Sequence, residues 1–311
     1  MKEFFSNEFA TLYNCDSRQM PIADESVDCV VTSPPYYGLR DYGIDGQMGL
    51  EESPEEYANT MVNVFREVWR VLKPTGTVWL NIGDSYAMSS MLGKNSEFKS
   101  IDQSKQGIVG INKKIPIGLK AKDLIGIPWR IAFALQADGW YLRSDIIWSK
   151  PNHMPESVKD RPTKSHEYIF LLSKNARYYY DADAIKEPTT SFDSNVRDRE
   201  NTRLNNVPGR GRMGGLTTNS YETKNKRSVW TVKTKPYKEA HFATFPEDLI
   251  EPCILAGCPK DGVVLDPFVG SGTTAAVAQK HGRKSIGVDL NIEYLQIAVK
   301  RLTTTQPRLV I

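Results

Sequence analysis

Short apolar runs alternate with longer amphipathic stretches along this chain. The runs at residues 12–14, 27–31, 77–82, 263–265 and 285–288 have the length and aliphatic composition of buried strands. Buried strands that alternate with helical stretches are typical of a parallel sheet covered by helices. The pattern therefore predicts an α/β fold.

Helical periodicity fills several of the spaces between these runs. The first helix is predicted to begin at Pro54, with Ser53 as its N-cap and Glu56 three residues beyond the cap. The turn-forming residues 73–76 should end this helix. Further helices are predicted at residues 123–138, where Pro128 implies a kink or a later start, and at residues 245–255, 273–281 and 292–302.

Three stretches depart from this alternation. Residues 141–148 and 167–172 are predicted to form an antiparallel hairpin at the edge of the sheet. Residues 89–114, rich in Gly, Ser, Asn and Lys, are predicted to be a mobile surface loop. Residues 191–238 have few aliphatic side chains and many Arg, Lys, Gly and Asn, as expected of an inserted module or a long loop.

The composition is that of a globular protein. Its 311 residues are 40% hydrophobic and 25% charged, and no apolar run or secretory segment favours membrane insertion or export. The four cysteines lack the spacing of a zinc site, so we expect buried thiols in a reducing compartment and no metal. These residues are Cys15, Cys29, Cys253 and Cys258.

Positive charge is concentrated in one segment. Residues 201–238 contain nine basic residues and one acidic residue, a charge of +8, so the rest of the chain carries −5 of the overall +3. Such a segment either contacts a polyanion or is a solvated loop, and its charge alone does not distinguish the two.

A glycine-rich loop, Asp-Pro-Phe-Val-Gly-Ser-Gly-Thr-Thr at residues 266–274, joins a predicted strand to a predicted helix. Gly270 and Gly272 allow a tight turn and close approach of the backbone to a ligand. Asp289, at the end of the next strand, can accept hydrogen bonds from both hydroxyls of a ribose. The arrangement predicts a site for a nucleoside-type cofactor.

A dinucleotide is the alternative ligand, because the spacing of Gly270, Gly272 and Ala275 also fits a dinucleotide fingerprint. However, Asp266 at the strand tip would repel a pyrophosphate and would hold the ammonium group of S-adenosylmethionine. Only 22 residues follow Asp289, too few for the remaining strands of a dinucleotide fold. Both points favour S-adenosyl-L-methionine as the cofactor.

A second loop, Ser-Pro-Pro-Tyr, follows the run at residues 27–31. Its prolines lock the backbone and remove two N–H donors, so the loop presents mainly acceptors, which an exocyclic amine requires. Fixed acceptors would pull the amine nitrogen toward tetrahedral geometry and free its lone pair to attack a sulfonium methyl, while the tyrosine stacks on a flipped base. The predicted catalytic residues are Ser33, Pro34, Pro35 and Tyr36.

The two loops together resemble those of the amino-directed DNA methyltransferases in the β arrangement. In that family the catalytic half comes first, a target-recognition region second and the cofactor half last. The matching segments are the catalytic motif at residues 33–36, the cofactor motif at 266–274, a cofactor-flanking segment at 241–247, the ribose-binding strand end at 287–290, and an N-terminal element at 14–16 in which Cys replaces Gly.

The resemblance implies a circularly permuted Rossmann-like methyltransferase fold that depends on S-adenosylmethionine. Its halves would be residues 1–185 and 239–311, with a basic target-recognition region at 186–238. The implied cofactor-binding residues are Asp16, Phe245, Asp266, Pro267, Phe268, Gly270, Ser271, Gly272, Thr273, Thr274, Asp289 and Leu290. The implied DNA-binding residues are Arg203, Arg210, Arg212, Lys224, Lys226 and Arg227.

The implied reaction is methyl transfer to an exocyclic amine in double-stranded DNA. Ser33 at the first motif position resembles the cytosine-N4 group, whereas the adenine-N6 group more often has Asp there. Adenine N6, the same chemistry on RNA, and a non-catalytic DNA-binding relative are the alternatives. The enzyme would be a monomer or homodimer in the bacterial cytoplasm or phage-encoded, either paired with a cognate restriction endonuclease or solitary.

Overall fold

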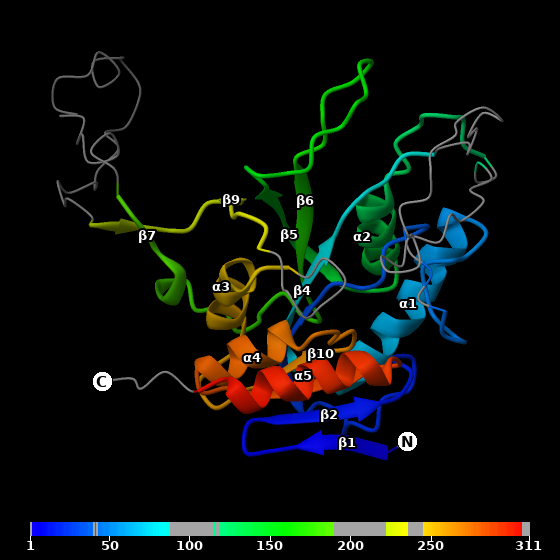
Figure 1. The fold of residues 1–311 in the computed structure, drawn as a ribbon. Coiled ribbons are helices and arrows are strands. Elements are labelled where there is room, and N and C mark those ends of the chain that lie inside the picture. Colours follow the sequence, from blue (N-terminus) through cyan, green and yellow to red (C-terminus); the bar gives the residue numbers. More distant parts are fainter. Residues whose placement is uncertain are drawn as a thin grey trace, which may run out of the picture.

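The computed structural model describes residues 2–39, 41, 43–87, 115, 118–189, 222–235 and 245–306, and the predicted mobile loop at 89–114 lies outside these ranges. Its main feature is a nine-stranded sheet (Figure 1). The strands are β1 (Lys2–Ser6), β2 (Ala10–Asn14), β3 (Val27–Thr32), β4 (Leu72–Ile82), β5 (Tyr141–Ser149), β6 (His166–Ser173), β9 (Val229–Thr231), β10 (Val263–Asp266) and β11 (Lys284–Asp289).

The spatial order of the strands is β1-β2-β11-β10-β3-β4-β6-β5-β9. The five strands from β2 to β4 in this order are parallel, and β6 is antiparallel to both of its neighbours. The predicted, mostly parallel sheet with an antiparallel hairpin is therefore confirmed. The hairpin is not at the edge, however, because β9 pairs with β5 outside it.

Segments from the two ends of the chain meet at the centre of the sheet. Strands β3 and β4 come from the N-terminal half, β10 and β11 come from the C-terminal half, and β3 pairs in parallel with β10. From this central pair the chain continues to opposite sides of the sheet. Strand β4 lies next to β3 on one side, and β11 lies next to β10 on the other. This is the switch point of a permuted Rossmann-like fold, where ligands bind at the carboxyl ends of the strands.

Helices cover both faces of the sheet (Figure 1). Alternate residues of β3 face opposite sides: Val30 packs in the hydrophobic cluster of α1 and α2, whereas Cys29 and Val31 pack in the cluster of α3 and α4. A third cluster joins α4 and α5 to β2. The helices are α1 (Pro54–Val71), α2 (Ile127–Ala137), α3 (Glu247–Gly257), α4 (Thr273–Lys280) and α5 (Ile292–Thr304).

Local signals place the helix starts. The Ser53 hydroxyl accepts a hydrogen bond from the Glu56 backbone N–H at 3.1 Å, so the predicted N-cap of α1 is confirmed. Helix α2 begins at Ile127, with Pro128 in its first turn. Of the two outcomes predicted from Pro128, the later start is therefore the one observed.

The predicted turn at residues 73–76 forms a bulge within β4. Val27 of β3 pairs with Leu72 and Cys29 pairs with Thr77, so the four residues between them loop out of register. Gly76 permits this fold-back, because a Cβ there would lie 2.4 Å from the Leu72 side chain. The preceding helix ends at Val71, as the turn-forming residues predicted, and pairing with β3 resumes at Thr77.

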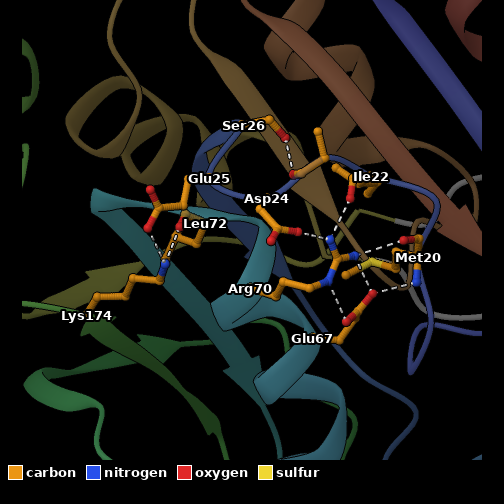
Figure 2. Close-up of polar contacts among 10 residues, drawn as sticks. Met20, Ile22, Asp24, Glu25, Ser26, Glu67, Arg70, Leu72 and Lys174 are labelled. Carbon is orange, nitrogen blue, oxygen red and sulfur yellow. Dashed lines mark hydrogen bonds and ion pairs between the residues drawn. The ribbon is translucent and has the colours of Figure 1, made fainter.

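Arg70, near the end of α1, holds the segment that leads into β3 (Figure 2). Its guanidinium donates to the carbonyls of Met20 and Ile22 at 2.9 and 2.8 Å. It also pairs with the carboxylates of Glu67 and Asp24 at 2.6 and 2.5 Å. The pKa of Glu67 is lowered mainly by its hydrogen bond to Arg70. These contacts fix the entry of the strand whose far end carries the Ser-Pro-Pro-Tyr loop.

A small peripheral sheet follows the main hairpin. After η2 (Asp183–Ile185), β7 (Glu187–Pro188) pairs antiparallel with β8 (Thr223–Lys224). All four cysteines are buried and unpaired, as predicted. Within the described ranges, no helix combines the length and apolar character that crossing a membrane requires.

Candidate active site

The Ser-Pro-Pro-Tyr loop and the glycine loop begin at the ends of adjacent parallel strands. Strand β3 ends at Thr32, one residue before Ser33, and β10 ends at Asp266. The Thr32 hydroxyl donates to Asp266 Oδ1 at 2.7 Å, so a direct hydrogen bond joins the two strand ends. The motifs are 233 positions apart in sequence, and the pairing of β3 with β10 makes them neighbours.

Asp266 is a buried carboxylate that links the two halves. Besides Thr32, it accepts from the Phe268 N–H at 3.1 Å and from the Thr274 hydroxyl at 2.7 Å. Burial raises its pKa to about 6, although the threonine hydrogen bonds favour the charged form. Three of its roughly four acceptor positions are thus occupied. The remaining acceptor position on Oδ2 is the one with which it would meet the predicted ammonium group.

The glycine loop has the tight geometry that its sequence predicts. Gly270 and Gly272 have φ values of +48° and +78°, in the left-handed region that favours glycine. A Cβ on Gly272 would lie 2.9 Å from the Cβ of Ala298, so α5 also requires glycine there. The Ser271 hydroxyl is buried and has no hydrogen-bond partner among the described residues. A buried hydroxyl without a partner is costly, which indicates that this loop receives a polar ligand group.

Asp289, at the end of β11, lies directly beside this loop. Its Oδ2 accepts from the Gly270 N–H at 2.9 Å and its Oδ1 accepts from the Asn291 N–H at 2.8 Å. Burial raises its pKa to about 6, against these backbone hydrogen bonds. Each oxygen keeps a second acceptor position, so the carboxylate has one position for each of two ligand hydroxyls.

The other six predicted cofactor residues have contacts of different kinds. Asp16 is ion-paired with Arg18 at 2.5 Å, and the Pro267 carbonyl accepts from Ser17 at 2.5 Å. The remaining four are Thr273, whose hydroxyl accepts from Arg301; Leu290, whose carbonyl accepts from Asn14; and Phe268 and Phe245, which are partly buried against the first and second hydrophobic clusters.

The catalytic loop is held at its second proline. The Tyr57 hydroxyl of α1 donates to the Pro35 carbonyl at 2.6 Å. Tyr36 lies partly buried, with its hydroxyl 3.4 Å from the Ser33 hydroxyl. A pocket of about 30 Å³ adjoins the loop, lined by Tyr36, Tyr37, Leu39, Gly83, Asp84, Ser85 and Ile127.

Three residues at this site were not predicted from the sequence. Glu167, at the start of β6, accepts from the Tyr36 hydroxyl at 2.8 Å. Lys150 is ion-paired with the other oxygen of Glu167, and Asn81 of β4 donates to Glu167 at 3.3 Å. Since β6 is antiparallel to β4, its first residues lie at the same edge as the carboxyl ends of the parallel strands. A charged residue at the start of a predicted apolar strand was the signal available.

Asp84 follows β4 at the same edge and caps a helix. Its Oδ1 accepts from the backbone N–H groups of Ser85, Gly126 and Ile127 at 2.9 to 3.1 Å. The last two belong to the start of α2, whose own N-cap residue is glycine. Asp84 therefore orients α2 beside the Tyr36 pocket.

Three of the six predicted DNA-binding residues are described. Lys224 belongs to β8, whereas Lys226 and Arg227 lie 3.6 and 3.1 Å from the carboxylate of Glu187. Arg227 keeps 71% of its side chain exposed. The other three, Arg203, Arg210 and Arg212, lie outside the described residues. Within the described ranges, no three His, Cys, Asp or Glu side chains gather as a metal site would require.

The chain is similar to known DNA methyltransferases. A family model described as DNA methylase matches residues 27–300. The chain is 49% identical over 298 residues to Type II methyltransferase M.Cfr9I of Citrobacter freundii, covering 94% of this chain and 87% of that protein. It is 48% identical over 278 residues to Type II methyltransferase M.SmaI of Serratia marcescens, covering 89% and 85%.

Solved structures share the fold. The cytosine-N4-specific PvuII DNA methyltransferase superposes with a TM-score of 0.64 at 19% identity, covering 96% of this chain and 88% of that one. TTHA0409 of Thermus thermophilus, in complex with S-adenosyl-L-methionine, has a TM-score of 0.57 at 23% identity, covering 95% and 94%. The chain belongs to the DNA methylase family. Within it, the chain is a Type II DNA methyltransferase of the N4/N6 group.

The methyl donor of this family is S-adenosylmethionine, which the TTHA0409 structure contains, in agreement with the prediction from the glycine loop. The residues present fit such a group. Two glycines give a close backbone approach, the Ser271 hydroxyl lacks a partner among the described residues, and Asp289 has acceptor positions to spare. A nucleoside with hydroxyls and no phosphate suits this donor and acceptor set better than a dinucleotide does.

Proposed function

We propose that this chain methylates the exocyclic N4 amine of a cytosine that is flipped out of double-stranded DNA. The observation that supports this most is the position of Ser33. Its neutral hydroxyl directly follows the strand that is hydrogen-bonded to the cofactor loop. A neutral hydroxyl can accept from the amine of cytosine or of adenine, and serine at this motif position is what resembles the cytosine-N4 group. The cytosine-N4 specificity of the PvuII structural neighbour is in keeping with this choice.

The residues of the catalytic loop would activate the amine by position. Hydrogen bonds from its N–H groups to the Ser33 hydroxyl and to the loop carbonyls localise the nitrogen lone pair. The two prolines and the Tyr57 hydrogen bond to Pro35 keep these acceptors fixed. No strong base is needed beforehand, because the amine proton becomes acidic once the nitrogen carries the methyl group.

The glycine loop and Asp289 would hold the cofactor. Asp289 would accept from the ribose hydroxyls, and Asp266 would hold the ammonium group with its remaining acceptor position. When bound, S-adenosylmethionine supplies a methyl group activated by its sulfonium. The Thr32 hydrogen bond to Asp266 then sets the spacing between the cofactor loop and Ser33.

We further propose that residues 186–238 are the target-recognition region between the two halves at 1–185 and 239–311. Lys226 and Arg227, two of the basic residues described there, are suited to phosphate contacts. The Type II designation and bacterial sources of the relatives support a restriction–modification role in the bacterial cytoplasm, with a cognate endonuclease that reads the same sequence.

Transfer of a deuterated methyl group tests this proposal. Purified protein would be incubated with S-adenosylmethionine carrying a CD₃ group and with plasmid from a methylation-free host, and the DNA would be digested to nucleosides for mass spectrometry. Mass-shifted N4-methylcytosine is expected. Mass-shifted N6-methyladenine would overturn the choice of cytosine and keep the reaction type, whereas labelled 5-methylcytosine would overturn the proposed role of the Ser33 loop.

A further inference from the structure

Glu167 and Lys150 belong to the β5–β6 hairpin, which lies on the opposite side of β3 from the cofactor loop. Glu167 is the second residue of β6, and Lys150 directly follows β5. Each keeps only 17% of its side chain exposed, and they form an ion pair. The Lys150 ammonium also lies 4.1 Å from the centre of the Trp148 ring. Two charges at this depth, beside the catalytic loop, need a reason beyond surface solubility.

The backbone near Tyr36 is shaped to let this tyrosine and Glu167 meet. A Cβ on Gly83 would lie 2.7 Å from Cε2 of Tyr36 and 3.3 Å from the Glu167 side chain. Asn81 supports the contact, since its amide nitrogen donates to the Tyr168 carbonyl at 3.1 Å and to Glu167 at 3.3 Å. The end of β4 therefore leaves room for one particular contact and reinforces it.

The chemistry of these groups fixes the direction of each hydrogen bond. An ionised carboxylate only accepts and an ammonium only donates. Two acceptors face the single phenolic proton of Tyr36, Glu167 Oε2 at 2.8 Å and Asn81 Oδ1 at 3.3 Å, and the shorter contact to the charged carboxylate takes that proton. Burial, and after it the charge of Glu167, raises the pKa of Tyr36 well above its usual value, so the phenol keeps that proton. The phenolic oxygen can then act toward Ser33 only as an acceptor.

The Ser33 hydroxyl consequently points its proton at Tyr36. The two oxygens are 3.4 Å apart, a long contact of the kind that shortens when a substrate binds. With its proton committed to Tyr36, Ser33 has its lone pairs available for other donors. An exocyclic amine brings N–H donors, so it meets an acceptor and not a competing donor.

We infer that Glu167, held by Lys150, is a positioning residue that sets the direction of the hydrogen-bond chain from Ser33 through Tyr36 and so keeps Ser33 an acceptor for the target amine. The inference rests on the proposed function, in which Ser33 binds that amine. Glu167 acts through Tyr36. Its carboxylate determines which group donates and which group accepts in each hydrogen bond between Ser33 and Tyr36 and between Tyr36 and Glu167.

Glu167→Gln tests the direction while keeping the shape. Because Lys150 only donates, the amide oxygen of the glutamine would turn to Lys150 and its NH₂ would face Tyr36. Tyr36 would then accept from the glutamine, and its own proton would be shared between Ser33 and Asn81 Oδ1, so the Ser33 proton would no longer be held away from the amine. We expect kcat to fall ~10- to 100-fold, as for a small misplacement at a reacting centre. The KM for DNA and the Kd for S-adenosylmethionine should stay within about twofold, since the chain does not include the glycine loop.

A double-mutant cycle with Tyr36→Phe distinguishes direction from simple packing. Tyr36→Phe alone should lower kcat by an amount similar to Glu167→Gln, and adding Glu167→Gln to it should lower kcat little further. If Glu167→Gln fails to fold, Tyr36→Phe alone still tests the chain, because it keeps the ring and removes only the hydroxyl. Glu156→Gln is the matched control: it removes an ion-paired carboxylate from the same hairpin connection and should leave kcat unchanged.

Methyl transfer would be followed as labelled N4-methylcytosine, with thermal unfolding of each variant recorded alongside. Full kcat in either single variant, or equal losses from Glu167→Gln with and without the Tyr36 hydroxyl, would overturn the inference. Production of a different methylated base by the unchanged protein would overturn the proposed function instead, so the two failures are distinguishable.

Discussion

Asp289 offers a direct test of the cofactor half of the site. Replacing Asp289 with Ala removes the acceptor for the Gly270 and Asn291 N–H groups and the two acceptor positions that we assign to the ribose hydroxyls. A hydrogen bond to a charged group contributes about 1.5–3 kcal/mol. Two such bonds at the lower limit amount to about 3 kcal/mol, which is roughly a 100-fold rise in Kd.

Isothermal titration with S-adenosylmethionine measures this effect without DNA or turnover. Glu293→Ala is a suitable control, because it removes an exposed carboxylate from the first turn of α5, four residues away, and leaves Gly270 untouched. DNA binding by Asp289→Ala should remain close to that of the unchanged protein. A folded Asp289→Ala variant that binds the cofactor with unchanged Kd would refute the role of this carboxylate.

The pH dependence gives a second signature of the same residue. With a pKa of about 6 in the cofactor-free protein, Asp289 takes up a proton as the pH falls through 6 and loses acceptor positions. Cofactor affinity should therefore fall by up to about tenfold per unit below pH 6. Without cofactor, the free energy of unfolding responds to pH in the opposite sense. Because burial raises the pKa values of Asp266 and Asp289, the native state binds more protons than the unfolded state does. The contribution of these two residues to the free energy of unfolding therefore increases as the pH falls from 7 toward 5. A fall in both cofactor affinity and the free energy of unfolding as the pH is lowered would contradict this assignment.

Three further changes test other parts of the account. Ser33→Ala should lower kcat by about 100-fold with cofactor Kd unchanged in titration, and a collapse of cofactor binding would mean that the roles of the two loops are wrongly assigned. Arg70→Met should cost about 2 kcal/mol in urea unfolding, because the mostly buried Glu67 loses its partner; an unchanged midpoint would argue against the contacts in Figure 2. Arg227→Ala, which leaves Glu187 paired with Lys226, should weaken DNA binding on all sequences alike and reduce the slope of log K against log salt by about 1; an unchanged slope would place Arg227 away from phosphate.

Much of the fold could be predicted because local signals and the global sheet agree. The cap at Ser53, the late start set by Pro128 and the apolar runs that became β3, β10 and β11 are all short-range patterns. The permuted order implied by the family resemblance accounts for the pairing of β3 with β10. In both cases the information lies within a few residues or in a motif that specifies one geometry.

The parts that were missed depend on pairing across the sheet. The residues 73–76 form a turn locally, and only the register with β3 makes them a bulge. Strand β9 arises from a segment whose composition predicted an insert, because Trp230 is buried beside Trp148 of β5. Strand β1 was not predicted, since it only extends the sheet through pairing with β2.

Glu167 was missed for a related reason. Its role depends on β6 running antiparallel, which brings the start of that strand to the edge where β4 ends. The sequence predicted a strand at residues 167–172 but assigned no chemistry to Glu167. In such a sheet, a polar residue at the start of an antiparallel strand is as much a candidate for the site as one at the end of a parallel strand.

The most direct test of the central claim is the base that this chain modifies in a cell. The unchanged protein and Ser33→Ala would be expressed at equal levels in a methylation-free host, and the genomic DNA would be digested to nucleosides for mass spectrometry. The account predicts N4-methylcytosine with the unchanged protein and a large reduction with Ser33→Ala. Abundant N4-methylcytosine from Ser33→Ala, or no methylated base from folded protein that binds S-adenosylmethionine, would contradict it.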